Sequence, residues 1–152
     1  MYNELKRNNV EMSQPTYRAV MDAYRQKRDL VSVVQVWTLL SGKHLPDPKS
    51  ISIIFQSASE MGQKSTAVAI HGIIRPEWII NRIGYCHLLD LTCKWLPELT
   101  FHVMIDLVNS GNTLDHADYC RMRDLCKPEL FQPIYSFVEE HFPEIMEEVD
   151  DE

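Results

Sequence analysis

Apolar residues recur along this chain at the spacing of amphipathic helices, and the same pattern returns every 34 residues. A 34-residue step joins Tyr17, Ile51, Tyr85 and Tyr119. Four further columns stay apolar in the same way: Val20, Ile54, Leu88 and Met122; Val33, Ala67, Phe101 and Tyr135; Val36, Ile70, Met104 and Val138; Leu40, Ile74, Val108 and Phe142. No insertion is needed to align them. The pattern predicts an all-α protein made of helix-turn-helix units.

Turn-forming residues divide each predicted unit into two helices. In the first unit Arg28-Asp29 separates the helices, and Gly42 with two following prolines ends the second helix. The predicted units cover residues 14–47, 48–81, 82–115 and 116–149. The second helices of the last two units are predicted over 97–110 and roughly 129–142. Two helices cannot bury both of their apolar faces alone, so each unit must stack on its neighbours as a solenoid. A plain helical bundle is the alternative, but it has no reason to keep a fixed 34-residue register.

The first unit carries the most specific sequence pattern. Residues 16–47 read TYRAVMDAYRQKRDLVSVVQVWTLLSGKHLPD, with a Thr-Tyr start, an Arg-Asp-Leu turn and a Leu-Pro-Asp ending. This stretch resembles a pentatricopeptide-repeat unit. The tetratricopeptide family has the same period, but it expects small residues at helix contacts where this chain has Val33 and Val36. The resemblance implies a right-handed α-solenoid of about four repeats over residues 14–142.

Both ends of the chain fall outside this array. Residues 1–13 resemble the second-helix end of a preceding unit, so we expect either a fragment of a longer array or an N-terminal cap. Residues 143–152 form an acidic tail. The first twelve residues resemble neither a secretory signal nor a transit peptide.

The family resemblance also implies where RNA bases would be read. Its members use two side chains per repeat, one after the aromatic residue of the first helix and one at the end of the unit. By register these pairs are Arg18 with Asp47, Ser52 with Asn81, and Cys86 with Asp115, while Cys120 would begin a fourth pair. Ser52 with Asn81 is most similar to a purine-reading pair, with adenine the closest match. Arg18, Cys86 and Cys120 depart from the usual Asn, Thr or Ser.

An explanation without RNA exists for the residues at the unit ends. Asp and Asn are favoured N-cap residues, so Asp47 and Asp115 are also predicted to cap the helices that follow them. The two roles are compatible. Candidate phosphate contacts, besides Arg18, are Arg25, Lys27, Lys49 and Lys64.

The charge distribution limits how strongly the chain can attract a polyanion. The net charge is -7, but residues 139–152 hold eight acidic residues and no Lys or Arg. The remaining residues carry fifteen basic and fourteen acidic side chains, and residues 1–50 have a local excess of three positive charges. This balance argues against strong nonspecific polyanion binding and permits a modest RNA groove.

Motifs for catalysis and for cofactor or metal binding are absent from the sequence. It has no Gly-rich phosphate loop, no His-Glu-x-x-His run and no Cys-x-x-Cys pair, so we expect neither an enzyme nor a cofactor. The four cysteines fall in predicted helices and are expected to be reduced and buried. Trp37, Trp78 and Trp95 are either base-stacking platforms or residues of the core or of an interface, and core or interface is the default expectation.

Two functions remain open at this stage. The first is an RNA-binding module of an organellar, mitochondrial gene-expression factor that holds single-stranded RNA along the first-helix face. The second is a structural helical-repeat subunit of a mitochondrial ribosome or another large assembly, which docks on protein without reading bases. No apolar run is long enough to cross a membrane, and no small-molecule substrate is indicated.

Overall fold

The computed structural model describes residues 12–145, which form α-helices joined by short connections, with no β-strand in that range. The helices are α2 (Gln14–Gln26), α3 (Leu30–Lys43), α4 (Pro48–Met61), α5 (Lys64–Ile73), α6 (Arg82–Trp95), α7 (Thr100–Asn109), α8 (His116–Leu125) and α9 (Phe131–His141). The all-α prediction is confirmed. Residues 1–11 of the predicted half repeat and 146–152 of the predicted acidic tail lie outside the described residues.

The first helix of each predicted unit begins after a polar N-cap residue, and these caps also lie 34 residues apart. They are Ser13, Asp47, Asn81 and Asp115, and each side chain accepts a hydrogen bond from the backbone amide three residues further on. Such a bond satisfies one of the free amides at a helix N-terminus. The predicted capping roles of Asp47 and Asp115 are therefore confirmed.

Two of the second helices begin differently from the prediction. We predicted single helices over 97–110 and 129–142, but 3₁₀ turns at Pro97–Leu99 and Pro128–Leu130 precede α7 and α9. Both turns have the sequence Pro-Glu-Leu. Proline has a fixed φ and no amide donor, so it is well suited to the first turn of a helix. The tighter turn starts each second helix without an unsatisfied amide at that position.

The five apolar columns form the core. All of their members are buried except Ile74, Phe101, Val108 and Tyr135, which are partly buried and pack against the buried cluster. Ile51, Ile54, Val33 and Leu40 have no exposed surface. Burying such a side chain contributes about 1.5–3 kcal/mol relative to leaving it in water, so these columns supply much of the driving force for folding.

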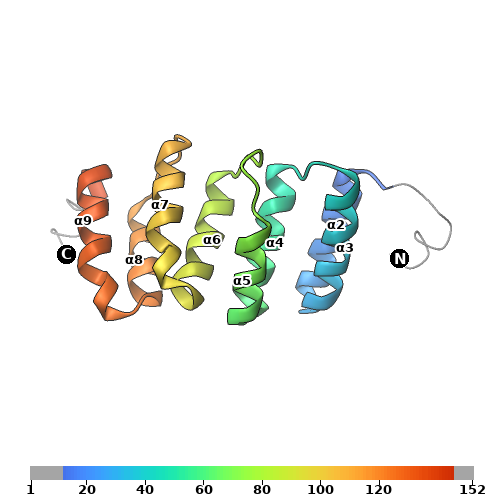
Figure 1. Cartoon of the computed structure of the whole chain (residues 1–152), viewed down its shortest axis with the longest axis horizontal. Coiled ribbons are helices and arrows are strands. Elements are labelled where there is room, and N and C mark those ends of the chain that lie inside the picture. The colour runs from blue at the N-terminus through green and yellow to red at the C-terminus, as the bar shows by residue number, and fades with distance from the viewer. Residues whose placement is uncertain (1–11, 146–152) are drawn as a thin grey trace.

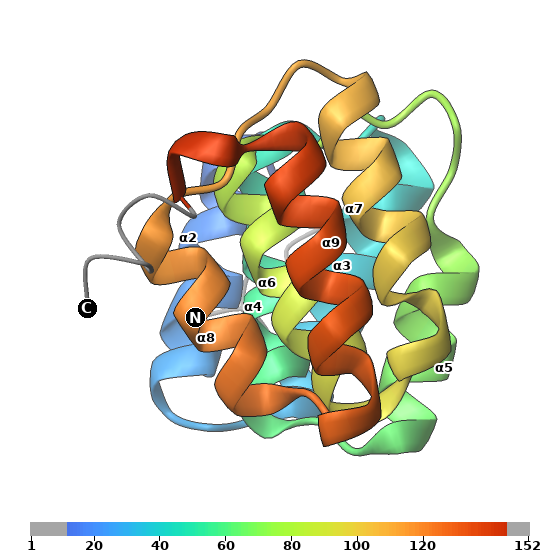
Figure 2. The same ribbon diagram turned by 90° about the vertical axis from the view of Figure 1, so that its left-hand side faces the viewer.

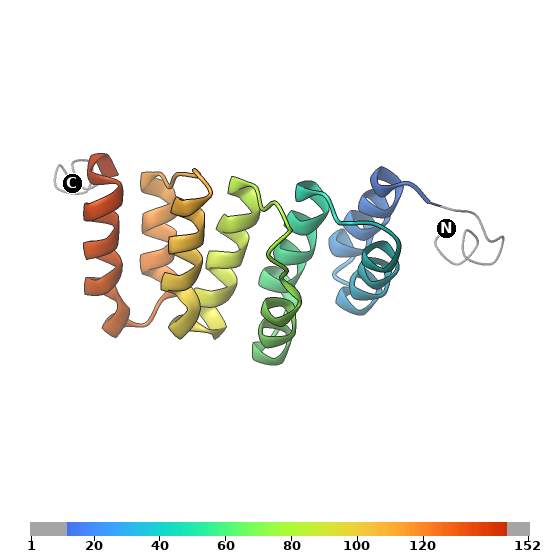
Figure 3. The same cartoon turned by 45° about the horizontal axis from the view of Figure 1, so that its top comes forward.

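The helices lie side by side in two layers along the long axis of the molecule (Figures 1 and 3). One layer contains α2, α4, α6 and α8, and the other contains α3, α5, α7 and α9, as the end-on view shows (Figure 2). Each helix of the first layer contacts the next, whereas no two consecutive helices of the second layer make comparable contact in the described range. The first layer is therefore packed more tightly than the second.

The tryptophans pack within this core. Trp37 on α3 is only 5% exposed and meets Trp78 edge to face, with ring centroids 5.6 Å apart. Trp78 and Trp95 are partly buried against the core cluster. Trp37 is therefore a core residue, and Trp78 and Trp95 pack against the core from its edge.

Candidate functional site

A hollow of about 420 Å³ opens on the first layer between α2 and α4. Three of the predicted base-reading residues, Arg18, Ser52 and Asn81, line it, and so does Lys49, a predicted phosphate contact. The other lining residues are Pro15, Ala19, Asp22, Ile53 and Ile83. Residues from three predicted units thus converge on one concave surface.

The second predicted pair is in direct contact. The Ser52 hydroxyl donates to Asn81 Oδ1 at 2.8 Å, and its oxygen also lies 3.0 Å from the Pro48 carbonyl. Asn81 Oδ1 accepts in addition from the backbone amide of Gly84 at 2.7 Å. Because that amide can only donate, it fixes the orientation of the Asn81 side chain. Asn81 Nδ2 is left with no hydrogen-bond partner among residues 12–145, so the pair retains an unused donor.

The pair is closely approached by the backbone of α6. A Cβ atom placed on Gly84 would lie 3.1 Å from Ser52 Oγ and 3.2 Å from Asn81 Oδ1. It would also lie 3.0 Å from a methyl carbon of Ile80. These distances are shorter than ordinary van der Waals contact, so glycine at this position gives the Ser52–Asn81 pair its room.

The first predicted pair is an ion pair. Arg18 Nη1 donates to Asp47 Oδ2 at 2.8 Å, while Asp47 Oδ1 accepts from the Ser50 amide, also at 2.8 Å. Burial opposes ionisation of Asp47, but the bonds from Ser50 and the charge of Arg18 outweigh it and lower the pKa of the carboxyl group. Gln14 holds the same loop, since its side chain bonds to Leu45 O and to the Asp47 amide. This pair therefore has a structural role whether or not it meets a ligand.

The third predicted pair differs from the other two. No hydrogen bond joins Cys86 to Asp115 within the described chain; the Cys86 thiol instead donates to Asp118 Oδ1 at 3.5 Å. Burial, helped by the nearby Asp118 carboxylate, raises the pKa of Cys86 to about 11. The thiol is therefore protonated at neutral pH. Asp115 caps α8 and accepts from Arg82 Nη2 at 3.0 Å.

A network of charged groups covers the first layer between α6 and α8. The buried Asp118 carboxylate accepts from Arg82 and, at 3.1 Å, from Arg121. Arg121 also donates to Asp90 at 2.7 Å, and Cys120 on the same helix lies 3.5 Å from His116 Nε2. Most of the hydrogen-bonding groups near the third predicted pair are thus committed to one another.

The candidate phosphate contacts do not form one row. Lys49 lies at the start of α4 and lines the hollow, but Lys64 begins α5 at the other end of the unit. Lys27 follows the end of α2, about 20 Å along the helix axis from its start. Arg25 is committed to ion pairs with Asp22 at 2.9 Å and Glu60 at 3.1 Å. Only Arg18 and Lys49 therefore line the hollow.

Sequence reasoning missed several residues of this surface. Pro15, Lys49 and Ile83 lie 34 residues apart and all line the hollow, so the periodicity alone was a sufficient signal for Pro15 and Ile83. Ile83 is 59% exposed beside the Ser52–Asn81 pair. The network of Arg82, Asp118 and Arg121 has no comparable signature in the sequence.

The remaining chemistry of the described residues is limited. Residues 12–145 contain no group of three or more His, Cys, Asp or Glu side chains placed to hold a metal ion. All four cysteines are free; Cys86, Cys93 and Cys126 are buried and Cys120 is partly buried. In the same range no helix is both long enough and apolar enough to cross a membrane.

Comparison with models of known protein families and with curated proteins finds no match for this chain.

Proposed function

We propose that this chain is a pentatricopeptide-like α-solenoid of about four repeats that binds single-stranded RNA on its first-helix layer. The Ser52–Asn81 pair, set in the hollow between α2 and α4, carries this proposal because its Asn81 Nδ2 has an unused hydrogen-bond donor. Single-stranded RNA exposes base edges that such donors can bind. Within the described residues, consecutive first helices are in closer contact than consecutive second helices, which supports a curved array whose inner surface is the first layer.

The proposed contact is local. The Asn81 amide donates to a ring nitrogen of a purine, with adenine the closest match, and the exposed side chain of Ile83 offers an apolar surface to the base. Lys49 supplies a cation for the adjacent phosphate. Arg82 and Arg121 engage the carboxylates beside Cys86, so we expect the RNA footprint to centre on the first two units rather than the third.

The cellular setting is proposed from the family resemblance alone. Such modules act in organellar gene expression, and we place this chain in a mitochondrial gene-expression factor without enzymatic activity. The second candidate function is a structural subunit of a mitochondrial ribosome or another large assembly. Exposed apolar side chains on the second layer favour a protein contact of this kind.

Fluorescence polarisation with labelled oligo(A) and oligo(U) tests the RNA proposal. Asn81→Asp keeps an oxygen that caps α6 but removes the Nδ2 donor, so we expect a loss of the preference for oligo(A) over oligo(U). The negative charge that Asn81→Asp adds weakens the binding of both RNAs alike, so the ratio of the two affinities isolates the base contact. Asp115→Asn, at the equivalent position one unit later, is the matched control and is expected to leave the ratio unchanged.

Salt dependence gives a second measurement. Lys49→Gln is expected to weaken the binding of both RNAs equally. It should also reduce the slope of log affinity against log salt concentration by about one. The RNA proposal is wrong if wild-type protein shows no affinity for either oligonucleotide at low salt. It is also wrong if Asn81→Asp retains the full preference for oligo(A).

A further inference from the structure

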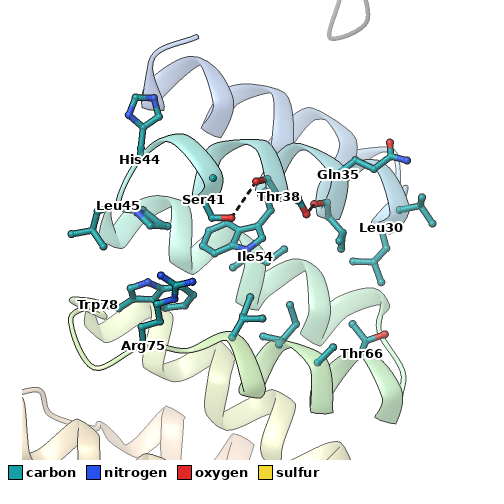
Figure 4. A pocket seen from close by; sticks show the side chains of 18 of the residues that line it. Leu30, Gln35, Thr38, Ser41, His44, Leu45, Ile54, Thr66, Arg75 and Trp78 are labelled. Atoms are coloured by element: carbon teal, nitrogen blue, oxygen red, sulfur yellow. Dashed lines mark hydrogen bonds between the residues drawn. The ribbon is translucent and has the colours of Figure 1, made fainter. Parts of the chain in front are cut away.

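A second concave surface lies on the opposite layer from the proposed RNA site. A groove of about 1090 Å³ runs between α3 and α5, with Trp37, Trp78 and Ile70 among the residues that line it (Figure 4). His44, Leu45, Trp78 and Arg75 lie at one end, and Leu30 and Thr66 lie at the other. The groove therefore follows the length of both helices.

The groove exposes an unusual concentration of apolar side chains. Val31 is 69% exposed, Leu45 60%, and Val34 and Ile73 37% each, and all four line the groove. Val31 and Val34 lie one helical turn apart on α3, so they form a stripe along one wall. Single exposed apolar residues are common on protein surfaces, but a continuous apolar patch marks an interaction site.

Small residues keep the groove open. Ser41 and Gly42 on α3, and Ser65 and Ala69 on α5, are among the residues that line it. A Cβ atom placed on Gly42 would meet no other atom within 4 Å, so this wall has free space beside it. With a rise of 1.5 Å per residue, α3 and α5 are about 21 and 15 Å long, which matches a partner helix of three to four turns.

The charge of the groove indicates which helix it would accept. None of the residues that line it is acidic, and Arg75 is exposed at the end where α3 and α5 finish. Arg75 has no ion pair within the described residues. A second cation, the exposed Lys43, ends α3 and directly precedes His44, which lines the groove. A carboxylate at this end of a bound helix would neutralise an unpaired guanidinium while the apolar stripe is covered.

We propose that the α3–α5 groove docks an amphipathic α-helix of a protein partner, with an apolar stripe against Val31, Val34 and Ile73 and acidic residues beside Arg75. This inference is independent of RNA binding, because the two surfaces lie on different layers and share no lining residue. A chain that holds RNA on one layer and a protein helix on the other acts as an adaptor between them.

The test uses three fluorescein-labelled synthetic helices of about 14 residues. The first has leucines spaced three and four apart and glutamates at one end; the second replaces the glutamates with lysines; the third has the residues of the first in scrambled order. We expect wild-type protein to bind the first peptide with a dissociation constant on the order of 10 µM, and the others at least about tenfold more weakly.

Two matched variants locate the binding site. Val31→Glu and Val68→Glu make the same change at positions that are 69% and 54% exposed, so neither disturbs the core, but only Val31 lines the groove. We expect Val31→Glu to lower the affinity for the first peptide at least about tenfold and Val68→Glu to leave that affinity unchanged. Arg75→Glu should reverse the preference, so that the lysine peptide binds more tightly than the glutamate peptide.

Several results would overturn the proposal. Equal binding of the scrambled peptide would show that the groove does not recognise a helical stripe, and no binding of the first peptide would show that it does not accept such a helix. If sedimentation shows that the wild-type chain is a dimer and that Val31→Glu is a monomer, the groove binds a second copy of this chain instead. RNA affinity should be the same in Val31→Glu and wild type, so failure here is distinguishable from failure of the RNA proposal.

Discussion

Asp47 joins two structural roles that can be separated by substitution. One carboxylate oxygen caps α4 through the Ser50 amide at 2.8 Å, and the other accepts from Arg18 at 2.8 Å. An N-cap bond of this kind contributes about 1 kcal/mol to stability. The ion pair is partly exposed, with 24% of the Arg18 side chain and 33% of the Asp47 side chain accessible, so it contributes about 0.5 kcal/mol.

These magnitudes predict an ordered series of variants. Asp47→Ala loses both interactions and should lower the free energy of unfolding by about 1.5 kcal/mol. Asp47→Asn keeps the cap and loses only the ion pair, so it should cost about 0.5 kcal/mol, and Arg18→Met should cost a similar amount. The Arg18→Met and Asp47→Asn changes should not add, because they remove the same ion pair.

Urea unfolding followed by far-ultraviolet circular dichroism measures this series, with the midpoint as the readout at constant m-value. The lowered pKa of Asp47 adds a test of sign. Its stabilising contribution is present above the unfolded pKa of about 4 and is lost as the pH falls through the lower folded value. The difference between wild type and Asp47→Ala should therefore shrink below about pH 4. If Asp47→Asn costs as much as Asp47→Ala, the cap is not the larger contribution and the reasoning is refuted.

Three further outcomes are expected. In urea unfolding, Gly84→Ala should be less stable than Gly72→Ala, because a Cβ at Gly84 crowds the Ser52–Asn81 pair. A Cβ at Gly72 meets open space and gains up to about 1 kcal/mol in helix propensity, so equal stabilities of the two variants would contradict this reasoning. Leu40→Ala should cost about 2–5 kcal/mol by urea unfolding because the side chain is fully buried, and a cost below about 1 kcal/mol would place Leu40 outside the core. Iodoacetamide at neutral pH, followed by peptide mass mapping, should label Cys86 more slowly than the partly exposed Cys120, since the pKa of Cys86 is raised to about 11; faster labelling of Cys86 would show that its thiolate is accessible.

The sequence by itself determined the helices, their boundaries to within a few residues and the residues of the core. These features depend on local physical chemistry: apolar spacing along one helix, side chains that cap free amides, and prolines that start or stop a turn. The 34-residue step placed Asp47, Asn81 and Asp115 at equivalent positions, and each caps the helix after it. The 3₁₀ turns before α7 and α9 were missed because a helical pattern does not distinguish the tighter turn from the first turn of an α-helix.

Only the tertiary structure decided which polar groups meet. Ser52 and Asn81 are 29 residues apart and Arg82 and Asp118 are 36 apart, and their contacts depend on how one helix pair is set against the next. Equivalent sequence positions therefore gave different chemistry: an ion pair in the first unit, a neutral pair with a free donor in the second, and no direct pair in the third. The α3–α5 groove has the same origin, because the width between two helices is fixed by the packing of the layer beneath them and not by either helix alone.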